Sequence, residues 1–268
     1  MKKIIVNGDD FAYSEGVNRG IIQAYQEGIL TSTTVMANLL TGREPYLQNL
    51  KSSKVTKPSL GIGVHLNLTS GEPLSTSWTE GKLNRPLRGK NDPKEWQGSI
   101  WRKYISSFTI VQIKEEYEAQ VQKTKEVFGS IDHVDSHHSS ASYFPAMEAY
   151  FELAKKYNLA VRPLAQLSEN SQYGGEMIIE KDFYQKAKQK GVRTVDSAEL
   201  RYLKKEDFYK VLESIKDGEL VEFMFHPAID SSRGEWRVAD YDLLTSSETL
   251  KRIKDLKLTL TTYAESSS

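Results

Sequence analysis

The chain has 268 residues, which suffices for one large α/β domain or two ordinary ones, and no linker-like stretch divides it. Lysine plus arginine equals aspartate plus glutamate at 36 each, so net charge gives no reason to expect nucleic acid or an anionic membrane as a partner. Cysteine is absent, which excludes a disulfide framework, a thiolate metal site and a thiol nucleophile.

Neither a membrane span nor a targeting segment is expected. No apolar run approaches the ~20 residues that a bilayer-spanning helix needs. The N-terminus has the pattern of a strand rather than a charged head with a long apolar core and a cleavage site, which argues against a signal peptide. We therefore expect a soluble, cytoplasmic protein.

The first eleven residues hold the strongest local signal. Residues 4–6 predict a short buried strand, because three β-branched residues in a row suit a pleated core position. The strand is expected to stop at Asn7-Gly8, and Asp9 and Asp10 follow at once, where α/β proteins bind ligands. Adjacent residues on an extended backbone point to opposite sides, so one carboxylate could hold a metal while the other takes a proton. The alternative is a solvated turn in which Asp10 is the first acid of a helix.

Strand and helix signals alternate along the rest of the chain. Helices are predicted from their apolar spacing and their start and stop residues at 14–28, 110–128, 145–154, 183–190, 207–216 and 241–255. Strands are predicted at 31–37, 60–66, 131–136, 159–161, 192–195, 220–225 and 258–262. A long irregular stretch at about 69–98 is expected to be a functional loop, in which Trp78 and Trp96 could stack on a sugar ring or simply pack in the core.

This alternation favours an α/β fold with a parallel sheet. Seven or eight strands, each followed by a helix, favour an irregular (β/α) TIM-like barrel over an open doubly wound sheet. The first strand lacks the glycine-rich loop of a dinucleotide-binding domain. We expect a single domain over residues 1–268.

All five histidines lie in or at the end of a predicted strand; they are His65, His133, His137, His138 and His226. Strand ends converge on one face of a barrel, so residues that are distant in sequence can share a site. Asp10, His65 and His137 make a two-histidine, one-carboxylate set that leaves metal positions open for water and substrate. For His65 alone, the alternative is a buried, hydrogen-bonded histidine. His138 is expected to face the other way and to pack or orient a neighbour, and His133 is expected to be structural.

Five motifs in order resemble the YdjC family of carbohydrate deacetylases, which includes chitooligosaccharide deacetylases. They are Asn7-Gly8-Asp9-Asp10-Phe11, Thr31-Ser32-Thr33-Thr34, Gly63-Val64-His65-Leu66, His133-Val134-Asp135-Ser136-His137-His138 and Glu222-Phe223-Met224-Phe225-His226-Pro227-Ala228. The matches cover nearly the whole chain. The family usually has alanine and glycine where this chain has Gly8 and Ala12, and often more histidine where this chain has Ser139-Ser140-Ala141.

The resemblance implies a barrel of the glycoside hydrolase/deacetylase type that acts on N-acetylated sugars such as short chitooligosaccharides. It also implies a divalent metal, expected to be Mg²⁺ with Zn²⁺ as the alternative, held by Asp10, His65 and His137. A homodimer is the family expectation.

Similarity to the wider polysaccharide deacetylases implies that Asp9 is the base and Asp10 a metal ligand, with a neighbouring carboxylate as the alternative base. His226 is expected to protonate the leaving amine, because a group that titrates near neutrality suits that task; the alternative is a histidine that ends a strand before Pro227. We place Arg162, His138 and Glu222 among the substrate-binding residues. Arg162 could instead hold Asp9 ionised, or form a surface salt bridge.

Two other functions fit a similar site. One is a metal-dependent sugar-phosphate isomerase or phosphoesterase on the same barrel, although an isomerase would usually recruit more carboxylates and a lysine at strand ends. The other is a sugar-binding protein that has lost catalysis, against which the intact Asp9, Asp10, His65, His137 and His226 argue.

Overall fold

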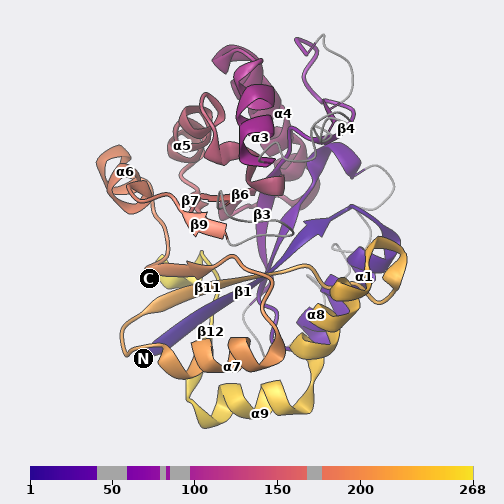
Figure 1. Cartoon of the computed structure of the whole chain (residues 1–268), viewed down its shortest axis with the longest axis vertical. Helices are drawn as coiled ribbons and strands as arrows, with labels where there is room; N and C mark the ends of the chain where they lie inside the picture. Colours follow the sequence, from indigo (N-terminus) through magenta and orange to yellow (C-terminus); the bar gives the residue numbers. More distant parts are fainter. Residues whose placement is uncertain (41–58, 79–82, 85–96, 168–176, 268) are drawn as a thin grey trace.

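The computed structural model describes residues 1–40, 59–78, 83–84, 97–167 and 177–267. A parallel sheet runs through the middle of the molecule in the order β10-β11-β1-β2-β3-β6-β7, with β12 paired to the start of β1 (Figure 1). The bounds of these strands are β1 Lys2–Phe11, β2 Ser32–Val35, β3 Gly61–Leu66, β6 His133–Ser136, β7 Ala160–Val161, β10 Ser197–Glu199, β11 Leu220–Phe225 and β12 Leu258–Leu260. Two small antiparallel pairs lie outside this sheet, β4 Ser70–Gly71 with β5 Leu83–Asn84, and β8 Ala165–Leu167 with β9 Met177–Ile179.

Strand β1 is the longest and passes through the centre of the fold. It pairs with β11 over Lys3–Gly8 and with β2 from Asn7 to Phe11. The predicted stop after Val6 is therefore wrong, because β11 pairs with β1 as far as Gly8 and β2 pairs with it again at Phe11, beyond the acidic pair. The register with β2 shifts between Gly8 and Phe11, and Asp10 lies within that shift at a φ of 71°.

The sheet curls along its length. Its edge strands β7 and β10 are not paired with each other in the described residues, but an isolated bridge joins Val161 of β7 to Thr194, three residues before β10. The predicted α/β fold with a parallel sheet is confirmed, and the described strands form a curled half-barrel.

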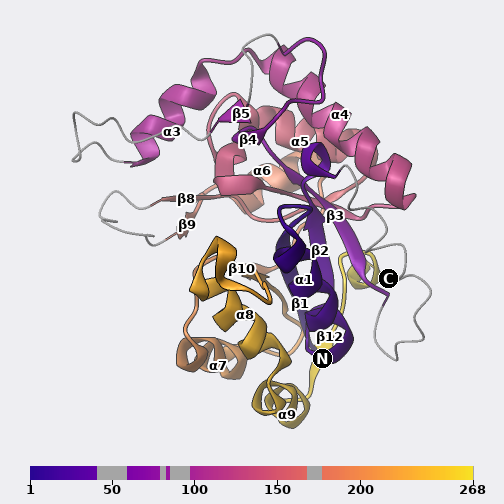
Figure 2. The same ribbon diagram turned by 90° about the vertical axis from the view of Figure 1, so that its right-hand side faces the viewer.

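Helices cover the sheet in two groups (Figures 1 and 2). One group packs on an apolar cluster that includes Ile21, Phe208 and Leu244, and consists of α1 Glu15–Glu27, α7 Lys205–Ser214, α8 Glu235–Thr245 and α9 Ser247–Asp255. The other packs on a cluster that includes Tyr117 and Phe151, and consists of α3 Gln97–Ser106, α4 Ile110–Phe128, α5 Ala146–Tyr157 and α6 Phe183–Lys190. Short 3-10 turns are η1 Ala37–Leu39, η2 His137–Ser142, η3 Ser231–Arg233 and η4 Glu265–Ser267.

Several predicted elements differ from those observed. The strand expected at 192–195 is reduced to the bridge at Thr194, and β10 begins three residues later. The helix expected at 241–255 is two helices, because extended backbone at Ser246 ends α8 and its hydroxyl accepts the backbone N–H of Thr249 to cap α9. Helix α3 was not predicted, since the irregular stretch before it obscured the spacing of Trp101 and Ile105.

The expected loop at about 69–98 is described only in part. Trp96 lies outside the described residues. Trp78 is buried against Phe108, so it packs in the core and does not present its ring to a sugar.

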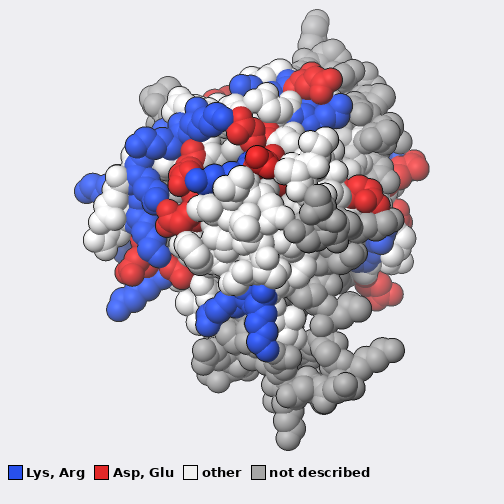
Figure 3. All heavy atoms as spheres, turned by 90° about the horizontal axis from the view of Figure 1, so that it is seen from above, with Lys and Arg blue, Asp and Glu red and all other residues white. Residues whose placement is uncertain are grey.

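No helix in the described part of the chain is long and apolar enough to cross a membrane. On the face seen from above, lysine and arginine lie beside aspartate and glutamate rather than in a field of one sign (Figure 3).

Candidate metal centre

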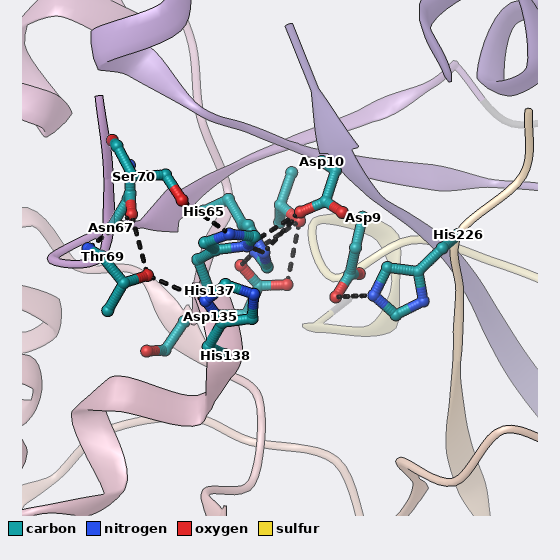
Figure 4. A network of polar contacts seen from close by, with 12 residues as sticks. Asp9, Asp10, His65, Asn67, Thr69, Ser70, Asp135, His137, His138 and His226 are labelled. Atoms are coloured by element: carbon teal, nitrogen blue, oxygen red, sulfur yellow. Dashed lines mark hydrogen bonds and ion pairs between the residues drawn. The ribbon is translucent and has the colours of Figure 1, made fainter. Parts of the chain in front are cut away.

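Three buried side chains bring one ligand atom each to a single point (Figure 4). Asp10 Oδ1 lies 3.1 Å from His65 Nε2 and 3.0 Å from His137 Nδ1, and the two nitrogens lie 3.2 Å apart. Ligands on a shared face of an octahedral ion, each bonded at about 2.1 Å, are separated by about 3.0 Å. The three predicted ligands are therefore brought together at the spacing that a divalent cation requires.

Hydrogen bonds on the far side of each ring leave lone pairs directed at this point. His65 Nδ1 lies 2.6 Å from Asp135 Oδ1, and a proton on Nδ1 leaves Nε2 as an acceptor. His137 Nε2 lies 3.4 Å from the Ser70 hydroxyl, which likewise leaves Nδ1 for the centre. Asp10 Oδ1 is buried and has no hydrogen-bond partner among the described residues. Three acceptors this close repel one another unless a cation or a proton lies between them.

The pKa values of His65 and Asp10 also indicate that positive charge is favoured at this point. Burial lowers the pKa of His65, but the carboxylates of Asp135 and Asp10 outweigh burial and raise it to about 10. Burial raises the pKa of Asp10, and the neighbouring His137 and His65 bring it well below its usual range. A proton on His65 or a cation beside it would each supply this positive charge.

The sheet explains how distant residues meet here. His65 on β3 and Asp135 on β6 are register partners, and His137 follows β6 directly. Asp10 comes from β1, and between β1 and β3 lies β2, whose Thr34 hydroxyl donates to Asp135 Oδ2 at 2.9 Å. The acidic pair was expected to point to opposite sides of an extended strand. The register shift and the positive φ of Asp10 instead let both carboxylates reach one site in different directions.

A buried guanidinium holds the second carboxylate of the pair. Arg162 donates from Nη1 and Nη2 to the two oxygens of Asp9 at 2.6 and 2.7 Å, and Nη1 also lies 2.7 Å from Asp135 Oδ2. Its Nε donates to Glu222 Oε1 at 2.8 Å. Burial raises the pKa of Asp9, and Arg162 reverses this and brings it well below its usual range. Arg162 is only 5% exposed, so the surface salt bridge considered from the sequence is wrong.

Glu222 lies beneath the site and is fully buried. Its second oxygen accepts the hydroxyl of Tyr263 at 2.5 Å, so both carboxylate oxygens already have partners. Burial raises the pKa of Glu222. This geometry suits a residue that positions Arg162 better than one that contacts a sugar.

His226 lies on the other side of Asp9 from His65 and His137 (Figure 4). Its Nε2 is 3.8 Å from Asp9 Oδ2, and its Nδ1 is buried without a hydrogen-bond partner among the described residues. Burial lowers the pKa of His226 to about 4 despite the nearby Asp9. The rings of Tyr202 and Trp236 pack on it with centroids at 5.5 and 5.2 Å.

The remaining histidines have the surroundings of supporting residues. His138 is exposed, stacks on His137 with centroids 3.8 Å apart, and pairs through Nδ1 with the Thr69 hydroxyl at 2.9 Å. His133 is fully buried, and a Cβ on Gly63 would lie 2.5 Å from its ring, so the strand glycine serves close packing.

Sequence reasoning missed Arg237. Its Nη2 donates to Asp10 Oδ2 at 2.6 Å, which fixes the carboxylate that the metal would share. Arg237 comes from α8 rather than from a strand end, and no motif or spacing distinguishes it from a surface arginine. Its Nε and Nη1 are buried and have no partner among the described residues.

Comparisons with known proteins agree on one family. The sequence model described as YdjC-like protein matches residues 3–255. Proteins named carbohydrate deacetylase from Thermoanaerobacter pseudethanolicus and Brevibacillus brevis are 32% and 30% identical, and each alignment covers 98% of this chain and 99% of the relative. A crystal structure from Enterococcus faecalis, described as a cellobiose-phosphate cleavage protein, aligns over 98% of both chains at 25% identity with a TM-score of 0.71.

Proposed function

This chain belongs to the YdjC-like family and is a carbohydrate deacetylase, and we propose that it uses a divalent metal to remove N-acetyl groups from short chitooligosaccharides. The observation that carries the proposal is the convergence of Asp10, His65 and His137 beside a base and an acid. The names of the relatives support deacetylation as the reaction, and the geometry of the site supports catalysis by a metal, a base and an acid.

The donor set fits a metal. Two imidazole nitrogens and one carboxylate would hold it, and the carboxylate of Asp135 behind His65 is the kind of partner that orients metal-bound histidines. Imidazole ligands favour Zn²⁺ and similar ions over Mg²⁺, which prefers oxygen. When bound, such an ion would polarise the acetyl carbonyl and make water a better nucleophile at neutral pH.

Asp9 is the base in this proposal. Arg162 keeps it ionised at neutral pH, and hydrogen bonds from Arg162 and from the Asn7 amide fix its orientation. A carboxylate with so low a pKa accepts a proton only transiently. It therefore needs a neighbour to which it can pass the proton on.

His226 is that neighbour. Because its pKa is about 4, the ring is neutral at pH 7 and can receive the proton from Asp9, whose pKa is lower still. A movement of less than about 1 Å would turn the 3.8 Å separation into a hydrogen bond. The leaving amine, with a pKa of roughly 8, is a stronger base than the imidazole, so the proton moves from Asp9 to His226 to the amine towards rising pKa.

The isomerase and phosphoesterase alternatives are less well supported. Arg162 pairs with the carboxylates of Asp9, Asp135 and Glu222, and its positive charge offsets part of the negative charge that a second metal ion would need.

Acetate release from diacetylchitobiose tests the proposal. Metal-reconstituted protein is expected to release acetate and one free amine in equal amounts. Asp9→Asn and His226→Gln are expected to reduce kcat by about 10²–10⁴-fold with little change in KM. Asp217→Asn, which alters an acid that is 86% exposed, is the matched control and should retain full activity. Binding of the sugar without any acetate release would instead support a sugar-binding protein.

A further inference from the structure

Two exposed aromatic rings flank the acid of the proposed site. Trp236 is 40% exposed and Tyr202 is 57% exposed, and their rings meet edge to face with centroids 4.9 Å apart. Both rings also contact the ring of His226. Large exposed aromatics cost free energy in water, and a cluster of them beside a reacting group indicates a ligand surface.

The backbone before Trp236 makes room for its indole. Gly234 has a φ of 117°, and a Cβ at this position would lie 2.5 Å from Trp236 Nε1. On its inner side the indole faces the guanidinium of Arg237, whose central carbon is 4.6 Å from the ring centroid. The orientation of Trp236 is thus fixed by its own loop and by a residue that also holds a metal ligand.

Arg237 adds hydrogen-bond donors to the same place. Its side chain is nearly buried, yet Nε and Nη1 have no partner among the described residues. A buried guanidinium with unpaired N–H groups costs free energy, which an oxygen atom of a ligand would recover. Because the third nitrogen, Nη2, donates to Asp10, the unpaired N–H groups lie beside the candidate metal centre.

We propose that Trp236, Tyr202 and the unpaired N–H groups of Arg237 form the subsite that binds the sugar ring carrying the acetamido group. This inference rests on the proposed function: the amine that receives a proton through His226 is attached to that sugar, so the ring must lie beside His226. The indole then offers a face for the apolar side of the pyranose, and Arg237 donates to one of its oxygens. Trp236 and Arg237 would thereby set how the amide is presented to the metal.

Sugar binding without turnover tests the subsite directly. Metal-loaded Asp9→Asn protein is titrated with diacetylchitobiose, and tryptophan fluorescence is followed alongside calorimetry. Trp236 should report binding, since Trp78 and Trp101 are buried, and Trp96 is replaced by phenylalanine throughout so that it adds no signal. Adding Trp236→Ala should raise Kd about 5–10-fold and remove the fluorescence change. Trp236→Phe should remove the fluorescence change but keep Kd within about 3-fold.

Steady-state kinetics separate binding from folding. In otherwise intact protein, Trp236→Ala should raise KM about 5–10-fold and leave kcat within 3-fold. Arg237→Lys keeps a cation beside Asp10 but removes the unpaired groups, and it should raise KM while metal affinity stays within about 3-fold. Leu250→Ala, an exposed apolar residue of α9, is the matched control and should change neither.

Specific results would overturn the inference. Unchanged Kd and KM in both Trp236→Ala and Tyr202→Ala would do so, as would a loss of kcat at constant KM, or a change in oligomeric state at constant Kd. An absence of acetate release from the unaltered protein would count against the proposed function instead, while the binding titration would still decide whether Trp236 meets a sugar.

Discussion

Replacing Arg162 by methionine should leave a cluster of buried carboxylates without their shared cation. The side chain is 5% exposed and contacts three carboxylates, those of Asp9, Asp135 and Glu222, at 2.6–2.8 Å. Methionine has a similar length but no charge. Removal of one partner of a buried ion pair costs about 3–5 kcal/mol, so we expect the free energy of unfolding at pH 7.5 to fall by about 4 kcal/mol.

The loss should depend on pH in a defined direction. In the native protein the pKa of Asp9 is depressed, so Asp9 contributes stability above its unfolded pKa of 3.8. Without Arg162, burial raises the pKa of Asp9 and of Glu222, and each group then contributes stability at low pH that is lost as the pH rises. As the pH falls from 7.5 to 5, the folded variant takes up one more proton than its unfolded chain over about 1.5 pH units, which is worth about 2 kcal/mol. The loss of stability relative to the native protein should therefore shrink to about 2 kcal/mol at pH 5.

Urea denaturation of the metal-free protein at pH 5 and 7.5 measures both effects. Arg201→Met is the matched control, because Arg201 is half exposed and its ion pair among the described residues is with Glu199 alone. It should cost less than about 1 kcal/mol at either pH. A loss of stability below about 1 kcal/mol for Arg162→Met at pH 7.5, or one that grows at pH 5, would show that Arg162 does not stabilise the buried carboxylates.

Three further predictions follow from individual groups. Metal binding must displace the proton on His65, whose pKa is about 10, so the dissociation constant for Zn²⁺ should fall about tenfold per pH unit between pH 6 and 8. Calorimetry in buffers of different ionisation enthalpy measures this proton release, and its absence would contradict the prediction. Burial raises the pKa of Asp240 to about 7, so its contribution to stability is lost between pH 3.8 and 7. On going from pH 5 to pH 8, Asp240→Asn should therefore gain about 2.6 kcal/mol over the native protein, and a pH-independent effect would argue against it. Ala12 has a φ of 81°, which glycine adopts at less cost, so Ala12→Gly should raise the free energy of unfolding by about 0.5–1 kcal/mol; a lower Tm would show that the site is not strained.

The clustering of Asp10, His65 and His137 could be predicted from the sequence because all three residues lie at strand ends. His65 and His137 end predicted strands, Asp10 follows another, and parallel strands bring their carboxyl ends to one edge. The residue types, histidine and aspartate, then limited the expected functions of the cluster to metal binding and proton transfer. The same reasoning placed Asp9 and His226 beside the centre.

The rest of the site depends on packing that no local pattern encodes. Arg237 reaches Asp10 from a helix more than 200 residues away in sequence, and the unequal surroundings of Asp9 and His226 arise only when the chain is folded. The position of β10 could not be predicted either, since residues 192–195 have the higher strand propensity, and pairing with β11 nevertheless places the strand at residues 197–199.

Metal-dependent acetate release shows most directly whether Asp10 and His65 hold a catalytic metal. Chelated protein, reconstituted protein, Asp10→Asn and His65→Ala are assayed on diacetylchitobiose, with Asp217→Asn as the control. We expect release only after metal is added, and a loss of at least about 100-fold in both ligand variants. Equal release from chelated protein, or from either ligand variant, would contradict it.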